Sequence, residues 1–180
     1  MTDAKKPMAE ANRISSMLNM VLGSDRFPVK VDELALEYSQ QCFPDDPITQ
    51  VRGEELDDFD GLLKVNKARN KWLIIYNSAV SSEGRKRFTI AHEFGHYILH
   101  RNQQSEFSCG TDDIETGDSR DIELEADLFA STLLMPLDDF RRQVDGQIGC
   151  PVRFGCCGRG TTVTTEATFT AREDRPLLPP

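Results

Sequence analysis

The sequence predicts an α+β domain in which helices pack on a small, mostly antiparallel β-sheet. Apolar residues recur at helical spacing near the N-terminus and again beyond residue 87, and segments of β-strand character lie between these two regions. With 180 residues, the chain is long enough for one domain with a substantial hydrophobic core. We therefore expect one domain over residues 1–145 and a tail of different composition over residues 146–180.

The composition is typical of a globular protein and argues against two classes of partner. Hydrophobic residues make up 38% of the chain and charged residues 28%. The formal net charge of -9 disfavours a nucleic-acid-binding surface, because such surfaces neutralise phosphates with lysine and arginine. The basic run Arg85–Arg87 is the one local exception. No apolar run approaches the roughly 20 residues that span a membrane, so we expect neither nucleic acid nor a membrane as partner.

The N-terminus and the cysteines predict the compartment. No hydrophobic signal segment follows the polar N-terminus, so we do not expect secretion by that route. Five cysteines are an odd number, and Cys42 and Cys109 stand alone, which suits a reducing compartment better than a disulfide framework. We expect a soluble protein of the cytoplasm.

Two helices are predicted near the N-terminus. The first spans Pro7–Leu22, with Gly23 as its stop, and its apolar residues recur every three or four positions: Met8, Ala11, Ile14, Met17, Leu18 and Val21. The second begins at Asp32, a candidate N-terminal cap, and continues through Tyr38. Pro44 and Pro47 then predict an irregular connection.

A β-hairpin is predicted next. Its strands are Phe59–Asn66 and Trp72–Asn77, and the polar stretch Lys67–Lys71 between them suits a turn. Ile48–Arg52 is a shorter strand candidate. We expect these segments to form the sheet, with the strand from Trp72 as its last member.

Two further helices follow. Phe88–His100 comes after a polar lead-in, Ser81–Arg87, and has an apolar side that predicts a buried helix: Ile90, Ala91, Phe94, Ile98 and Leu99. Asp121–Met135 is the second helix, ended by Pro136. The polar segment 102–119 between them is expected to be a long loop that borders a cleft.

The last segments of the chain are different. Asp138–Arg142 predicts one more turn or short helix. The tail is rich in cysteine, glycine and threonine and poor in apolar residues. We expect it to be poorly ordered, because it has too few apolar residues to offset the conformational entropy lost on folding.

The histidine helix carries the clearest chemical motif. His92 and His96 are four residues apart, so both imidazoles lie on one face and can hold one zinc ion. Glu93 completes the His-Glu-x-x-His pattern of zinc hydrolases. His100 lies a further turn away, and at ~1.5 Å rise per residue the helix from His92 to His100 exceeds about 10 Å, too far for all three histidines to share one ion. We expect His100 to be a cleft or packing residue.

The acidic helix is the expected source of a third ligand. Glu123 and Asp127 share a face, whereas Glu125 points about 200° away from Glu123 at ~100° per residue. We expect Glu123 to bind the metal and Asp127 to accept the outer N–H of a ligand histidine, which would orient the ring. Glu125 would then face solvent or a neighbouring element.

Two residues between the histidines have expected roles as well. Glu93 is predicted to be the general base, which takes a proton from zinc-bound water and later passes it to the leaving amine. Gly95 has no side chain and would permit close approach by the sheet or by substrate.

Two stretches of the chain resemble the ImmA/IrrE family of zinc metallopeptidases. These are Arg87-Phe-Thr-Ile-Ala-His-Glu-Phe-Gly-His-Tyr-Ile-Leu-His100 and Glu123-Leu-Glu-Ala-Asp-Leu-Phe-Ala-Ser-Thr-Leu-Leu-Met-Pro136. The resemblance covers roughly residues 10 to 140. Many members have Asn where this chain has Asp127, and the tail departs from the helical sequence that usually follows.

The resemblance implies a zincin-like fold and a specific activity. The family's zinc ligands fall on His92, His96 and Glu123, and its catalytic glutamate falls on Glu93. Members are intracellular bacterial or phage proteins, and several cleave helix-turn-helix repressors, which switches on stress-response or mobile-element genes. The resemblance therefore implies a zinc-dependent endopeptidase with a repressor as its protein substrate. Two alternatives stay open: a non-catalytic zinc domain that sequesters a regulatory protein, and a zinc hydrolase of a non-peptide amide.

Overall fold

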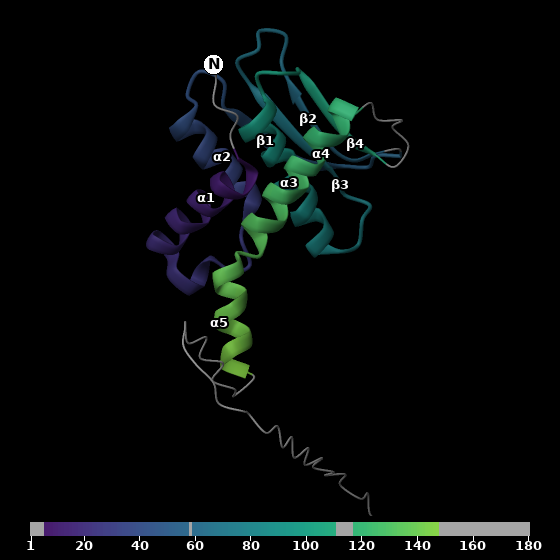
Figure 1. Ribbon diagram of the computed structural model, residues 1–180. Coiled ribbons are helices and arrows are strands. Elements are labelled where there is room, and N and C mark those ends of the chain that lie inside the picture. The colour runs from purple at the N-terminus through teal and green to yellow at the C-terminus, as the bar shows by residue number, and fades with distance from the viewer. Residues whose placement is uncertain (1–5, 58, 111–116, 148–180) are drawn as a thin grey trace, which may run out of the picture. The chain divides into compact units, whose positions relative to one another are not determined.

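The computed structural model describes residues 6–57, 59–110 and 117–147 of the chain (Figure 1). Its elements, in chain order, are α1 (Pro7–Leu22), η1 (Gly23–Arg26), α2 (Val31–Cys42), β1 (Ile48–Glu54), β2 (Phe59–Val65), β3 (Trp72–Asn77), α3 (Glu83–His100), β4 (Glu106–Gly110), α4 (Gly117–Leu134) and α5 (Leu137–Gln147). The α+β prediction is confirmed. From residue 148 on, the predicted tail lies outside the described residues, and its expected poor order stays a prediction.

The N-terminal helices form for local reasons. α1 has the predicted bounds, begins on Pro7, and ends where Gly23 takes a φ of 57°, a conformation that favours glycine. α2 begins one residue before the predicted start. The expected cap at Asp32 is wrong, because Lys30 occupies the cap position and Asp32 lies in the first turn. Its negative charge still suits the positive end of the helix dipole there.

The sheet has the strand order β1-β3-β2-β4. β2 pairs antiparallel with both β3 and β4, and β1 pairs parallel with β3, so the sheet is mixed and mostly antiparallel. The predicted hairpin of β2 and β3 is confirmed. Leu63, at the centre of β2, lies opposite Ile74 on one side and Phe107 on the other, and all three side chains are buried.

The elements around the histidine helix differ from the prediction in three ways. β4 lies within segment 102–119, which was expected to be a loop, so β3 is not the last strand. Its five residues alternate polar and apolar only briefly within a polar segment, and pairing with β2 supplies its hydrogen bonds. α3 starts at Glu83 instead of after Arg87, because the Ser82 side chain accepts a hydrogen bond from the Arg85 amide and caps the helix. α4 likewise begins four residues before the predicted start.

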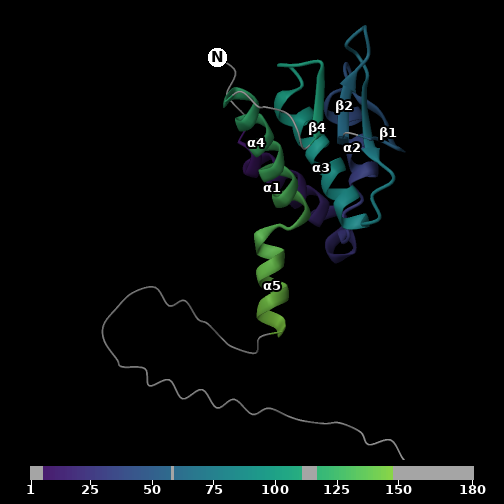
Figure 2. The same ribbon diagram turned by 90° about the vertical axis from the view of Figure 1, so that its right-hand side faces the viewer.

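The core surrounds α3, which lies between the sheet and α4 (Figure 2). An aromatic group connects the layers: the Tyr97 ring meets those of Trp72, Phe43 and Phe94 at centroid distances of 6.0, 5.7 and 6.3 Å. The Tyr97 hydroxyl donates to the Asp46 carbonyl at 3.0 Å. This packing buries every residue from Thr89 to Ile98, and so fixes the position of the histidine helix. Within the described part of the chain, no helix has the length and apolar character to cross a membrane.

Candidate metal centre and active site

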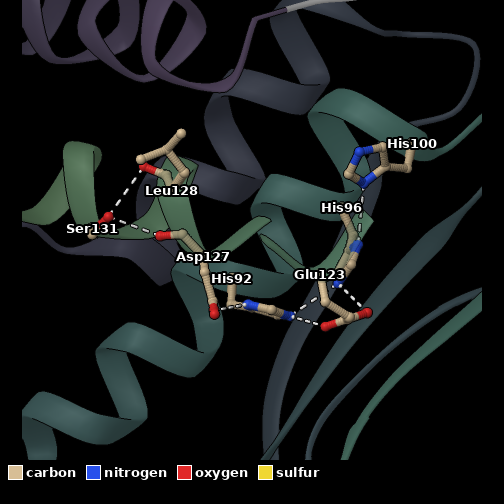
Figure 3. A network of polar contacts seen from close by, with 7 residues as sticks. All are labelled: His92, His96, His100, Glu123, Asp127, Leu128 and Ser131. Atoms are coloured by element: carbon tan, nitrogen blue, oxygen red, sulfur yellow. Dashed lines mark hydrogen bonds and ion pairs between the residues drawn. The ribbon is translucent and has the colours of Figure 1, made fainter. Parts of the chain in front are cut away.

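Three side chains from α3 and α4 converge at one point (Figure 3). His92 Nε2 lies 2.9 Å from His96 Nε2 and 3.0 Å from Glu123 Oε2, and His96 Nε2 lies 3.2 Å from Glu123 Oε1. One donor atom from each residue lies within 4.8 Å of the others. The two imidazoles are 3% and 1% exposed and the Glu123 side chain 23%, so the group is largely shielded from solvent.

The hydrogen bond behind His92 determines which way its lone pair points. His92 Nδ1 lies 2.9 Å from Asp127 Oδ1, and an ionised carboxylate can only accept a hydrogen bond. The proton is therefore on Nδ1, and the Nε2 lone pair points toward the Glu123 carboxylate. Electron-rich atoms that face each other in this way repel unless a proton or a cation lies between them. The donor set thus fits a divalent metal ion held by two imidazoles and a carboxylate.

The pKa values of Glu123 and His96 favour the binding of a cation between them. Burial raises the pKa of Glu123, but the His92 and His96 imidazoles beside its carboxylate outweigh burial and lower it to about 2. Burial lowers the pKa of His96 to about 4. At neutral pH, Glu123 is therefore a carboxylate and His96 a neutral imidazole, which are the protonation states that metal ligation requires.

Glu93 is fully buried beside this group. Neither of its carboxyl oxygens has a hydrogen-bond partner among the described residues. Burial raises its pKa to about 8, with His92 acting to lower it and Glu123 to raise it. A carboxyl group left without a partner at 0% exposure needs an explanation, and a nearby cation or a bound water would provide one.

β2 covers Glu93 at Gly61. A Cβ atom at Gly61 would lie 2.6 Å from Glu93 Oε1 and 2.5 Å from Thr89 Cγ2, closer than any side chain could fit. Glycine is thus required for the strand to lie directly against the carboxyl group. No feature of the sequence alone had identified Gly61 as part of the site.

Comparison with protein families identifies the kind of site. A family model described as the IrrE N-terminal-like domain, Peptidase_M78, matches residues 45–149, which is more than half of the chain. The chain belongs to this family. A comparison with curated proteins found no match. The peptidases of the M78 family are metal-dependent, and the matched region contains His92, His96 and Glu123.

His100 and Glu125 contact each other in this M78 domain. Of the two roles expected for His100, its exposure of 1% favours packing in the interior over lining an open cleft. Its Nδ1 lies 3.2 Å from His96 Nδ1, and its Nε2 lies 2.9 Å from Glu125 Oε2. Glu125 therefore faces a neighbouring helix, one of the two positions expected for it.

Other neighbours of the site were not predicted from the sequence. The close approach at Gly95 comes from α4, and the expected approach by the sheet or a substrate is wrong: an added Cβ would lie 3.1 Å from Phe129 Cδ1 and 3.3 Å from the Ala126 backbone. The Phe107 ring stacks on His96 with centroids 4.7 Å apart and planes inclined by 17°. Phe107 was missed because β4 itself was not predicted.

The basic run at the start of α3 forms local ion pairs. Arg85 pairs with Asp60 at 2.6 Å, and Lys86 pairs with Glu83 at 2.9 Å. These contacts give the run a structural role at the junction of α3 and β2.

Proposed function

We propose that this M78 peptidase is a zinc-dependent endopeptidase whose ion is held by His92, His96 and Glu123. The observation that carries the proposal is the convergence of two imidazole Nε2 atoms and one carboxylate on a single point, 2.9–3.2 Å from one another. Three protein ligands of this type leave a fourth position open for water, as in catalytic zinc sites. A zinc ion there would supply Lewis-acid polarisation of the scissile carbonyl and lower the pKa of a bound water to around 7.

Glu93 is proposed as the general base. An Oε atom of its carboxylate would accept a proton from the attacking water and then pass it to the leaving amine. Burial keeps this carboxyl group protonated at neutral pH, whereas a nearby dication favours its ionised form. The base would therefore become active only when the metal is present. Asp127 supports this chemistry by holding the Nε2 lone pair of His92 toward the ion.

We propose a helix-turn-helix repressor as the protein substrate, cleaved in the cytoplasm as part of a stress-response or mobile-element switch. Membership of the IrrE-like family supports this choice. The formal charge of -9 also supports it, because an acidic protein is attracted to the basic surface with which a repressor binds DNA. The same charge disfavours direct binding of this protein to nucleic acid.

A second candidate function is a metal-binding domain that sequesters a regulatory protein without cleaving it. The burial of Glu93 favours this alternative, because its exposure is 0% and β2 lies directly against it at Gly61. A substrate could reach the base only after β2 or its surroundings had moved.

The two functions differ in what happens to the repressor. Purified wild type, Glu93→Gln and the control Glu37→Gln, an exposed glutamate of α2, would be assayed for bound zinc and incubated with a candidate repressor. The endopeptidase predicts cleavage fragments with wild type and Glu37→Gln, and none with Glu93→Gln despite retained zinc. If wild type and Glu93→Gln both release the repressor from DNA without fragments, the sequestration function is correct.

A further test addresses the third ligand. Glu123→Ala is expected to abolish zinc binding, whereas Glu125→Ala is not. If zinc is lost from Glu125→Ala and kept by Glu123→Ala, the proposed ligand set is wrong.

A further inference from the structure

A hydrogen-bonded chain lies behind His96, on the side away from Glu123. It runs from Glu125 Oε2 to His100 Nε2 over 2.9 Å, and from His100 Nδ1 to His96 Nδ1 over 3.2 Å. His96 and His100 are each 1% exposed, so water does not compete for the contact between them. The proposed metal ligation uses neither His100 nor Glu125.

The order of donors and acceptors in this chain follows from the carboxylate at its end. Glu125 can only accept when ionised, so His100 Nε2 carries a proton and donates it. A neutral His100 then has its lone pair on Nδ1, which can accept from His96. His96 must therefore donate from Nδ1, and its own lone pair lies on Nε2, the atom that faces Glu123.

His100 is placed to act on His96 and not on the metal itself. The candidate metal group consists of His92, His96 and Glu123, and His100 is absent from it. The nitrogen of His100 nearest to the site contacts Nδ1 of His96, which is the ring atom opposite the ligand position. The Phe107 ring stacks on the face of the same imidazole. The His96 ring is thus held at its edge by His100 and on its face by Phe107.

We propose that Glu125 and His100 form a positioning relay that holds His96 in its Nδ1–H tautomer and aims its Nε2 lone pair at the metal. This inference rests on the proposed metal site. Asp127 performs the same task for His92 through one direct bond. α4 thus supplies the carboxylate that orients each ligand imidazole, directly for one and through His100 for the other.

The tautomer can be measured without any metal or substrate. The chain has three histidines, so long-range proton–nitrogen NMR spectra contain few imidazole signals, and single substitutions assign them. The measurement uses metal-free Glu123→Ala, in which no carboxylate faces Nε2 of His96 to favour a proton there. In this background His96 should show a protonated Nδ1 and an unprotonated Nε2. When Glu125→Ala is added, His100 is released from its acceptor, and the Nε2–H tautomer of His96 should become populated. Glu125→Gln should restore the starting pattern, because its amide oxygen can still accept from His100.

Zinc affinity provides the second readout, by competition with a chelator. Loss of an outer partner of a ligand histidine weakens metal binding about 10- to 100-fold, and this is the loss expected for Glu125→Ala and His100→Gln. Asp121→Asn is the matched control, since it removes an exposed acid from the same helix, and it should bind zinc as the wild type does.

The Glu125 side chain is 48% exposed, so Glu125→Ala is expected to fold. The test therefore stays decisive even if His100→Gln fails to fold. The relay is refuted if Glu125→Ala leaves both the His96 tautomer and the zinc affinity unchanged. Failure of the proposed metal site would look different. Wild type would then bind no zinc, and the metal-free tautomer measurement would still decide whether the relay exists. Failure of the peptidase activity alone would leave zinc affinity and the relay untouched.

Discussion

Replacing Glu93 with glutamine should make the metal-free protein more stable, and increasingly so as the pH rises. The carboxyl group is completely buried and has no hydrogen-bond partner among the described residues. Burial disfavours its ionised form, which raises its pKa from the ordinary 4.5 to about 8. Glutamine has nearly the same shape but does not ionise.

The sign and size of the effect follow from proton linkage. Below pH 4.5 the carboxyl group is protonated in both the folded and the unfolded chain, so it adds no pH dependence. Between this value and about 8, the unfolded chain releases a proton that the folded chain retains. The free energy of unfolding then falls by about 1.4 kcal/mol per pH unit, a total of about 5 kcal/mol. At pH 7, Glu93→Gln should therefore be about 3 kcal/mol more stable than the wild type.

Urea unfolding of chelator-treated protein between about pH 5 and pH 8 measures this difference. Glu37→Gln is the control, because it removes an exposed glutamate from α2 and should follow the wild type at every pH. Added zinc should reduce the pH dependence of the wild type, since a nearby dication favours the carboxylate. Parallel loss of stability in wild type and Glu93→Gln across this range would refute the assignment of Glu93 as the buried titrating group.

Two packing predictions use matched pairs of substitutions, each measured by thermal or urea unfolding. Gly61→Ala should lower the free energy of unfolding by about 1–3 kcal/mol, because its Cβ would lie 2.5 Å from Thr89 Cγ2. Gly84→Ala, with its nearest neighbour at 3.7 Å, should cost nothing, and equal effects at the two sites would contradict the close approach of β2. Phe129→Ala should cost about 3–5 kcal/mol, because the ring is fully buried between α3 and α4. Phe140→Ala removes a ring that is 56% exposed and should cost far less; similar losses would mean that the core is misplaced.

Local sequence patterns were sufficient for α1 and for the hairpin of β2 and β3. In α1 the apolar spacing, Pro7 at the start and Gly23 at the end all act within a few residues, so they can be read without the fold. The hairpin is equally local, because a polar turn joins two adjacent apolar runs. β4 could not be found in this way, because its hydrogen bonds come from β2, more than forty residues earlier in the chain.

The sequence by itself determined the half-sites of the metal centre. Helix geometry places His92 and His96 on one face of α3, and Glu123 and Asp127 on one face of α4. These relations depend only on residue spacing within each helix.

Only the tertiary structure decided how the two halves meet and what surrounds them. It brought α4 against Gly95, placed β2 over Glu93, and joined Glu125 to His100. Each of these contacts links elements far apart in the chain. Their geometry comes from the packing of α3 between the sheet and α4, which no periodicity within a single element contains.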